Sequence, residues 1–208
     1  MRESVRRAAA LGVCVGAHPG YPDMLGFGRR DLDASPDEVT AYVVYQVGAL
    51  AAICHAEGVR LRYVKPHGAL YNAIVHHEEQ AAAVVQAVVD YDRTLPVLGL
   101  PGSVWLRRAK EAGLTVVEES FADRAYTPEG TLVSRRLPDS VLHDPDEIAA
   151  RCLAMATGGT IKDIEGGTLA LSPGSICVHG DTPGAVEIAR RVRDTLTGAG
   201  VELSAFAP

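Results

Sequence analysis

The sequence predicts an α/β fold built on a parallel β-sheet, and two observations predict it. First, short apolar runs rich in β-branched residues alternate with long segments of helical periodicity. Second, these runs are nearly continuous in apolar residues, which is typical of strands that helices cover on both faces. The runs predicted as strands are residues 12–18, 61–67, 95–100, 114–121 and 175–180.

The segments between these runs carry the start signals of helices. One begins with Ser35 as N-cap, Pro36 at the first helical position and Glu38 placed to close a capping box. The same pattern recurs from Asp144 and from Thr182. A helix between successive strands is the connection that a parallel sheet needs. Helices are predicted over residues 1–12, 35–58, 76–92, 103–113, 144–159 and 181–200.

Two stretches interrupt the alternation of strands and helices. Residues 123–143 have no helical period, and a long irregular segment in a compact domain is typical of a functional lid. Residues 160–171 predict a β-hairpin that turns at Glu165-Gly166-Gly167. No linker composition divides the chain, so residues 1–208 are expected to form a single domain.

Composition narrows the class of protein. The 208 residues are 47% hydrophobic, which is enough for one sizeable core. A net charge of −6 and an aromatic content of 5% argue against nucleic-acid binding. No uninterrupted apolar run reaches the roughly 18 residues of a membrane span, and the N-terminus lacks the apolar core of a signal peptide. We therefore expect a cytoplasmic protein without a membrane partner, whose four separated cysteines are buried and reduced.

Three of the predicted strands end in a histidine followed by glycine. The endings are "VGAHPG", "VKPHGA" and "CVHGD", which contain His18, His67 and His179. The carboxyl ends of parallel strands meet at one edge of the sheet, where α/β proteins bind their ligands. The three histidines are therefore predicted to converge. The remaining histidines are predicted to be surface or structural residues.

Other polar residues follow the same strand ends or lie a few positions away. Imidazoles and carboxylates suit acid–base catalysis, and cations can hold an anion, so hydrolysis or ring opening of a C–N bond is the chemistry that this set favours. Structural hydrogen bonding of each histidine, a simple salt bridge of Lys65 and a divalent metal site are the alternatives. Helical HxxxH or HExxH spacing, a phosphate loop and a GxSxG elbow are absent from the sequence. The additional candidates are Asp23, Arg29, Arg30, Lys65, Asn72, Glu119, Asp123, Arg124 and Asp181.

Five longer segments carry a resemblance to a known family. They are "GVCVGAHPGYPDMLGFGRR", "YQVGAL", "VKPHGALYN", "FADRAYTPEGTLVSRR" and "SICVHGDTPGAVEIAR". In this order they resemble the LamB/YcsF family, and the resemblance runs over the whole chain. It implies a TIM-like, seven-stranded β/α barrel related to glycoside hydrolase and deacetylase barrels. It also implies ATP-dependent opening of 5-oxo-L-proline to L-glutamate, with Mg²⁺ accompanying ATP, and assembly with two further subunits of B and C type.

The chain departs from the family pattern at its start. Members of the family begin with a strand of the form Asp-Leu-Asn-Cys-Asp-Leu-Gly-Glu and a second strand, Asn-Ile-Ala-Cys-Gly-Phe-His-Ala-Gly-Asp. Neither motif occurs in this sequence. The expectation is therefore a barrel that lacks its first two strands, about forty residues, through an internal methionine taken as the start or through a natural truncation.

The implied reaction suggests roles for the candidates. ATP would activate the lactam oxygen as a phosphate ester, and a base would direct water to the ring carbon. The catalytic set is His67 or His179 as the base, Asp181, and Lys65 for oxyanion or phosphate stabilisation together with Arg124. Asp23, Asp123 and Asp181 would orient the histidines or hold Mg²⁺. Predicted binding residues for substrate or phosphate are His18, Asp23, Arg29, Arg30, Asn72, Glu119, Asp123 and Arg124.

Two other functions fit the same residues. A metal-dependent amide hydrolase of the deacetylase type would need no ATP and would bring His18, His67 and His179 onto one metal ion. A non-catalytic subunit would bind a small carboxylate without turning it over.

Overall fold

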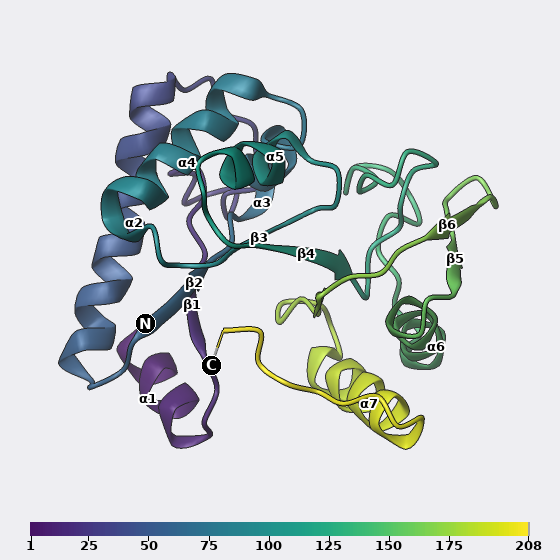
Figure 1. The fold of residues 1–208 in the computed structure, drawn as a ribbon. Helices are drawn as coiled ribbons and strands as arrows, with labels where there is room; N and C mark the ends of the chain where they lie inside the picture. Colours follow the sequence, from purple (N-terminus) through teal and green to yellow (C-terminus); the bar gives the residue numbers. More distant parts are fainter. Residues whose placement is uncertain (208) are drawn as a thin grey trace. The chain divides into compact units, whose positions relative to one another are not determined.

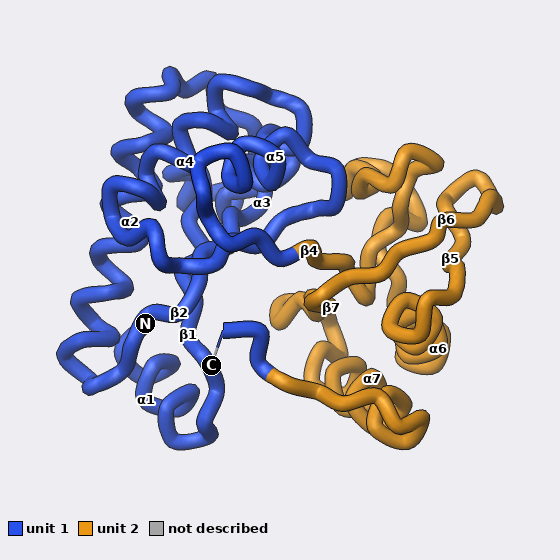
Figure 2. The backbone as a smooth tube through the Cα atoms, viewed as in Figure 1, with its two compact units in different colours: residues 1–117, 205–208 blue, residues 118–204 orange. Residues whose placement is uncertain are grey.

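The computed structural model describes residues 1–207, which form two compact units (Figures 1 and 2). Unit 1 contains Met1–Val117 and the residues from Ala205 on, and unit 2 contains Glu118–Ser204. Both units combine parallel strands with helices, so the predicted α/β class is confirmed. The seven-stranded barrel, its missing first strands and the single domain stay predictions.

Unit 1 is built on parallel strands whose connections contain helices. β2 pairs with β1, with Ala17 opposite Val64, and it pairs with β3 on its other side, with Val64 opposite Val97. The elements of unit 1 are α1 (Arg2–Ala10), β1 (Val15–Ala17), α2 (Pro36–Ala56), β2 (Leu61–Val64), α3 (Gly68–Ala73), α4 (Glu78–Asp92), β3 (Val97–Gly99) and α5 (Val104–Glu111).

The core of unit 1 lies between these strands and the packed helices α2, α4 and α5. Val43 of α2, Val84 of α4 and Val97 of β3 are completely buried in it. Trp105 of α5 is buried in the same cluster, and its indole N–H donates to the main-chain oxygen of Leu98 at 3.0 Å. The indole N–H therefore has a hydrogen-bond acceptor inside the apolar core, as a buried donor requires.

The start of α2 follows the predicted capping box. The Ser35 hydroxyl accepts from the main-chain N–H of Glu38 at 3.3 Å, and the Glu38 carboxylate accepts from the main-chain N–H of Ser35 at 2.9 Å. The predictions of Asp144 and Ser103 at helix starts are also confirmed, because each side chain accepts main-chain N–H groups of the following turn.

Helix α2 has a high average hydropathy, although no uninterrupted apolar run in it reaches 18 residues. The helix is long and apolar enough to cross a membrane by length and composition, because Gln46 and Gly48 interrupt its apolar run without lowering the average hydropathy much. However, Val39, Val43 and Val47 are buried in unit 1, where α2 packs against α4. Packing therefore accounts for the valines on one face of α2, while 22% of its apolar window is buried in this structure.

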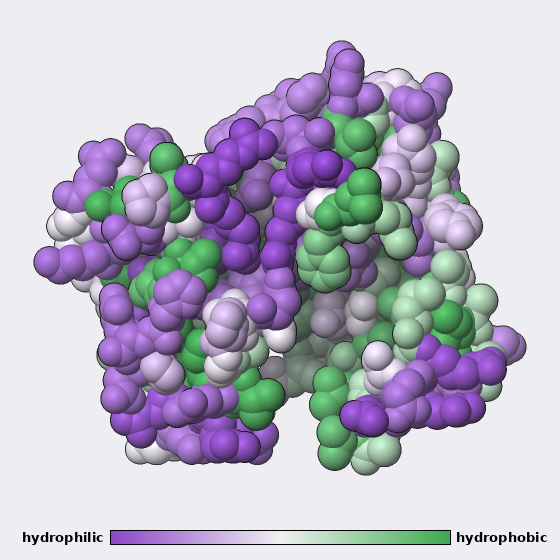
Figure 3. Space-filling view, turned by 180° about the vertical axis from the view of Figure 1, so that it is seen from behind, coloured by the Kyte–Doolittle hydropathy of each residue, from purple (hydrophilic) through white to green (hydrophobic). Residues whose placement is uncertain are grey.

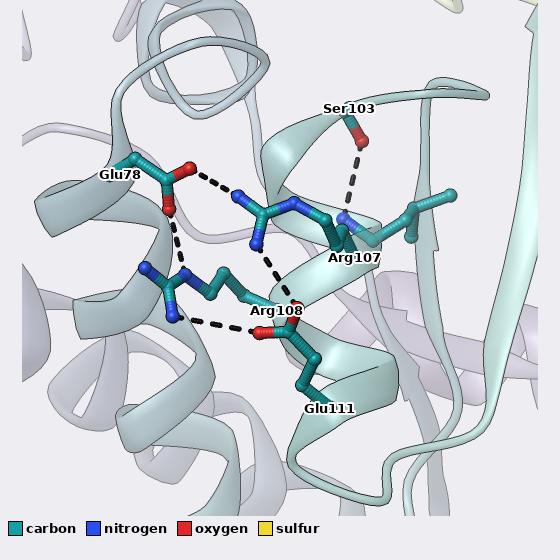
Figure 4. Close-up of polar contacts among 6 residues, drawn as sticks. Glu78, Ser103, Arg107, Arg108 and Glu111 are labelled. Atoms are coloured by element: carbon teal, nitrogen blue, oxygen red, sulfur yellow. Dashed lines mark hydrogen bonds and ion pairs between the residues drawn. The ribbon is translucent and has the colours of Figure 1, made fainter.

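A surface network joins α4 to α5 (Figure 4). Both arginines of α5, Arg107 and Arg108, contact the carboxylate of Glu78 at the start of α4, and both also contact Glu111 one turn further along α5. All four side chains are exposed to solvent, so each ion pair contributes only about 0–1 kcal/mol. The network lies on the helices and does not contribute to the candidate site.

Unit 2 is built around a second parallel pair. β4 pairs with β7 in a register that places Phe121 opposite Cys177. The predicted hairpin is confirmed, since β5 and β6 pair antiparallel with Ile161 opposite Leu169. Helices α6 and α7 pack against each other. The elements are β4 (Val116–Phe121), which begins at the end of unit 1, α6 (Pro145–Ala156), β5 (Thr160–Lys162), β6 (Thr168–Ala170), β7 (Ser175–Cys177) and α7 (Ala185–Gly198).

Residues 123–143 are irregular, as predicted, but they are pinned to the rest of unit 2. Within the segment, isolated β-bridges join Arg124 to Val141 and Tyr126 to Leu132. The buried Tyr126 hydroxyl accepts from the main-chain N–H of Phe121 at 2.8 Å. This hydrogen bond ties the segment to the end of β4.

Several local predictions need correction. The strands are shorter than predicted: β2 and β7 end three residues earlier, β4 begins two residues later, and β1 and β3 are shortened at both ends. The short helix α3 was not predicted, since six residues are too few to show a helical period. Helix α7 starts at Ala185 after Gly184 in a left-handed conformation (φ 78°), so Thr182 is not its N-cap. Cys54 and Cys152 are buried as expected, but Cys14 and Cys177 are only half-buried.

Candidate active site

The candidate residues form two groups, one within each unit. In unit 1, the backbone contacts between β1 and β2 continue past the strand ends. Lys65 N–H donates to Ala17 O at 2.9 Å, and His67 N–H donates to Pro19 O at 2.8 Å. The two segments therefore stay side by side up to their histidines. His18 and His67 are brought together, as the strand-end pattern predicted for neighbouring parallel strands.

The imidazoles of His18 and His67 are in direct contact. Nε2 of His18 lies 3.0 Å from Nδ1 of His67, and the rings meet edge to face with centroids 4.7 Å apart. The other nitrogen of each ring faces a main-chain oxygen. Nδ1 of His18 is 2.7 Å from Lys65 O, and Nε2 of His67 is 2.7 Å from Phe27 O. All four ring nitrogens are thus engaged within unit 1.

The glycine-rich loop after β1 supplies the carbonyl that holds His67. Phe27 has a positive φ of 57°, which is uncommon for a residue with a side chain and places its main-chain oxygen against the imidazole. The next oxygen, that of Gly28, accepts from the N–H of Ala69 at 2.9 Å. This approach is possible because residue 68 is glycine: a Cβ there would lie 2.3 Å from Gly28 O.

The base of the same loop is fixed by Gln46 of α2. Its amide nitrogen donates to Gly20 O at 2.7 Å, and its amide oxygen accepts from Gly20 N–H at 3.1 Å. Both hydrogen bonds are made to the same residue, so they set the direction of the chain directly after His18. Gln46 was not predicted as a site residue, because a helical pattern does not distinguish it from a solvated glutamine; its place in "YQVGAL", a segment that carries the family resemblance, was the one signal.

Asp23 and Arg30 form an ion pair within the loop. The carboxylate of Asp23 contacts the Arg30 guanidinium and accepts from the main-chain N–H groups of Gly26 at 2.9 Å and Arg30 at 3.2 Å. The hydrogen bond from the Arg30 side chain is the main cause that lowers the pKa of Asp23 to about 2. Both charges are used to close the loop.

The remaining unit 1 candidates lie around this loop. The Arg29 guanidinium lies 5.2 Å from the centroid of the Phe27 ring. Lys65 is half-buried directly after β2, with its ammonium 6.0 Å from the centre of the Tyr71 ring. Asn72 is exposed on α3.

A pocket of about 500 Å³ opens beside the histidine pair. His18 and His67 line it together with aromatic residues of the loop and of α2, among them Tyr21, Phe27 and Tyr42. Its rim includes exposed apolar side chains such as Met24. Figure 3 shows one face of the molecule, on which green apolar patches lie among purple polar ones. The pocket thus combines apolar walls with an imidazole pair.

In unit 2, Asp123 and His179 form the second group. Each lies two residues beyond the last paired residues of β4 and β7, Phe121 and Cys177, and the Ala122 N–H still donates to Cys177 O at 2.9 Å. Nδ1 of His179 is 2.7 Å from Oδ1 of Asp123. The strand-end pattern therefore places this pair correctly as well.

The Asp123–His179 geometry fixes the tautomer of the histidine. Asp123 is completely buried, and burial alone would raise its pKa, but the hydrogen bond and charge of His179 and the hydrogen bond of Thr182 lower the pKa below its usual value. An ionised carboxylate only accepts, so Nδ1 of His179 carries the proton and a neutral ring keeps its lone pair on Nε2. The ring also stacks on Phe121, with centroids 5.6 Å apart.

Thr182 is a site residue that the sequence pattern misassigned. Its hydroxyl donates to Oδ2 of Asp123 at 2.8 Å, so both oxygens of the buried carboxylate are satisfied. Its position three residues after His179 was the one available signal, and it was outweighed by the Thr-Pro pattern of a helix start.

Arg124 has a structural position. Its buried guanidinium donates to the main-chain oxygens of Ser140, at 3.1 Å, and Val133, and so holds the irregular segment 123–143. Glu119 is completely buried in β4, and Asp181 is exposed in the turn before α7. Among residues 1–207, no group of three or more His, Cys, Asp or Glu side chains is arranged to hold a metal ion. The convergence of all three histidines on one site stays a prediction.

Comparisons with known proteins agree on one family. The sequence model of the LamB/YcsF family matches residues 1–208. A Kocuria rhizophila protein, named as the A-type subunit of 5-oxoprolinase, is 55% identical over 207 residues, which cover 100% of this chain and 82% of that protein. A protein of Mycobacterium avium with the same name is 59% identical, covering 97% of this chain and 80% of its own length. The crystal structure of the lactam utilization protein from Thermus thermophilus is similar, with 48% identity and a TM-score of 0.91 over 99% of this chain and 82% of that chain.

Proposed function

We infer the function of this chain from the premise that it belongs to the LamB/YcsF family. We propose that it is the A-type subunit of a 5-oxoprolinase, which opens the lactam ring of 5-oxo-L-proline to give L-glutamate with hydrolysis of ATP. The names of relatives that are 55–59% identical support this proposal. The likeness to a lactam utilization protein supports the same substrate class and a TIM-like β/α barrel.

The observation that carries the proposal is the pairing of the buried Asp123 carboxylate with His179. Opening an unstrained lactam needs a base that directs water to the ring carbon, and an imidazole held by a carboxylate is such a base. Nε2 of His179 is the lone-pair nitrogen of the neutral ring, and the carboxylate stabilises the imidazolium that forms when Nε2 takes a proton from water. Both nitrogens of His67 are engaged, so we assign the base to His179 rather than to His67.

ATP enters this proposal as a co-substrate and not as a group held by residues identified in this chain. The carboxylates of Asp23 and Asp123 are engaged by hydrogen bonds from protein groups, so they do not fit a Mg²⁺ site. Arg30 and Arg124, which were predicted to bind phosphate, are occupied by Asp23 and by main-chain oxygens. We propose that much of the nucleotide site is supplied by the partner subunits, of B and C type, in an assembly in the cytoplasm.

Glutamate release from 5-oxoproline and ATP, measured with the partner subunits present, tests the proposed base. His179→Gln is expected to lower turnover about 10²–10⁴-fold, the usual contribution of a general base. His143→Gln is the matched control, because His143 is an exposed histidine of the same unit. Turnover of His179→Gln equal to that of the control would overturn the assignment. Binding of 5-oxoproline without turnover by the complete assembly would instead favour a non-catalytic, carboxylate-binding subunit.

A further inference from the structure

The hydrogen-bond partners of His18 and His67 determine where their protons lie. A main-chain oxygen only accepts, so the ring nitrogen that faces it must carry a proton. Nδ1 of His18 faces Lys65 O, and Nε2 of His67 faces Phe27 O, both at 2.7 Å. In the neutral form of each ring, the remaining nitrogen would therefore hold a lone pair.

These two remaining nitrogens face each other. Nε2 of His18 and Nδ1 of His67 are 3.0 Å apart, which is a hydrogen-bond distance. Two lone pairs at this distance repel, whereas one proton between them makes a charge-assisted hydrogen bond. The pair then carries three ring protons on two imidazoles, so it has a charge of one. Its geometry fits a monocation and does not fit two neutral rings.

We propose that His18 and His67 share one proton and that the resulting cation makes the adjacent pocket a binding site for a small organic carboxylate. All four ring nitrogens are engaged inside unit 1, so the pair acts on the ligand through its charge and not as a hydrogen-bond donor. The aromatic walls of Tyr21, Phe27 and Tyr42 receive the apolar body of the ligand.

The other charges around the pocket do not cancel this cation. Among the described residues that line it, Asp23 is the one carboxylate, and Arg30 neutralises it. Further titratable or charged groups come from each neighbouring element: Arg29 from the loop, Tyr42 and Tyr45 from α2, Lys65 from the end of β2 and Tyr71 from α3. None of these adds a negative charge at neutral pH; the carboxylate of Asp31 acts on Tyr21, and against it stand the positive charges of Arg29 and Lys65.

The inference deepens the proposed function and rests on it only for the natural ligand, which would be the carboxylate of 5-oxoproline. Two kinds of measurement test it on the full chain. The first is ¹⁵N NMR of the histidine side chains near neutral pH. We expect protonated shifts for Nδ1 of His18 and Nε2 of His67, and intermediate shifts for the two facing nitrogens. Lone-pair shifts at both facing nitrogens would overturn the proposal.

The second measurement is calorimetric binding of three probes: 5-oxoproline, its neutral carboxamide, and cyclopentanecarboxylate, which has no lactam. We expect the two carboxylates to bind at least about tenfold more tightly than the carboxamide, from the Coulomb energy of one nearby charge. Their affinity is expected to fall as pH rises and the shared proton is lost. Equal affinity for carboxylate and carboxamide, or no dependence on pH, would overturn the proposal.

Two variants test whether carboxylate binding depends on the His18–His67 pair or on another histidine of the surface. His18→Gln keeps a polar side chain beside His67 but removes the second imidazole, and it should weaken carboxylate binding about tenfold or more. His55→Gln, an exposed histidine of α2 outside the pocket lining, is the matched control and should bind as the wild type does. Wild-type affinity in His18→Gln would refute the role of the pair. Tight binding of cyclopentanecarboxylate without turnover of 5-oxoproline would support the site and contradict the proposed function.

Discussion

Replacing Asp123 by Asn tests whether the orientation and tautomer of His179 matter, with little change in volume. In the wild type, Oδ1 accepts from His179 and Oδ2 accepts from Thr182, and the carboxylate is completely buried. Thr182 donates its hydroxyl proton, so the amide oxygen of an asparagine is expected to take the position of Oδ2. The amide N–H₂ would then face Nδ1 of His179. The ring would have to accept there and move its proton to Nε2, which is the nitrogen proposed as the base.

The magnitude follows from what the substitution removes. Loss of general-base catalysis corresponds to about 10²–10⁴-fold in turnover, which is roughly 3–5 kcal/mol of transition-state stabilisation. The effect on folding is smaller, because asparagine can keep two hydrogen bonds and loses only their charge assistance. We expect the free energy of unfolding to fall by about 1–3 kcal/mol.

Two assays separate these effects. Turnover is measured as glutamate release with the partner subunits present, and stability is measured by urea unfolding of the chain. Asp146→Asn is the matched control, because Asp146 is an exposed carboxylate of unit 2 paired with Arg191, and surface pairs contribute about 0–1 kcal/mol. The reasoning would be refuted if Asp123→Asn kept wild-type turnover, or if its loss of turnover were matched by Asp146→Asn.

Three further predictions concern the loop of unit 1 and a buried thiol. Gly68→Ala should lower the free energy of unfolding, measured by urea titration, by about 2 kcal/mol or more, since φ is +59° and the new Cβ would lie 2.3 Å from a main-chain oxygen. Gly130→Ala is the control: φ is also positive but the space around it is open, so the same titration should show a loss of about 1 kcal/mol. Arg30 lowers the pKa of Asp23 from 3.8 to about 2. The stability that the ionised Asp23 carboxylate adds is therefore present above its ordinary pKa and is lost as pH falls toward 2. The difference in unfolding midpoint between wild type and Asp23→Asn should therefore shrink over that window, and a constant difference would contradict it. Burial raises the pKa of Cys152 to about 12, so iodoacetamide should alkylate it only on unfolding, and rapid native-state alkylation would disprove this.

The parts of the fold that local signals specify could be predicted from the sequence. The capping box at Ser35 and the hairpin at Glu165 depend on residues close together in the chain, and both form as predicted. The start of α7 could not be predicted in this way. Thr182 has the pattern of an N-cap, but its hydroxyl is used by Asp123, a partner 59 residues away in the sequence. Tertiary contact overrides local propensity at this position.

The prediction that residues at the carboxyl ends of parallel strands meet was also correct for strands that are direct neighbours. It pairs His18 with His67 and Asp123 with His179, because the ends of neighbouring parallel strands must lie side by side. It says nothing about which nitrogen of a ring is free. That depends on the Phe27 carbonyl, whose direction is set by a positive φ that few phenylalanines adopt.

The assignment of roles to the histidines follows from this difference in partners. A histidine whose neighbour is a buried carboxylate has one committed nitrogen and one basic nitrogen, which is the arrangement of a base. A histidine whose neighbours are a carbonyl and a second imidazole has no uncommitted nitrogen, and its pair is stable only as a cation. The same residue type at the same kind of strand end therefore supports proton transfer in unit 2 and attraction of an anion in unit 1. Exchanging a single partner, as Asp123→Asn does, should convert the first arrangement into an inactive one while leaving the second intact.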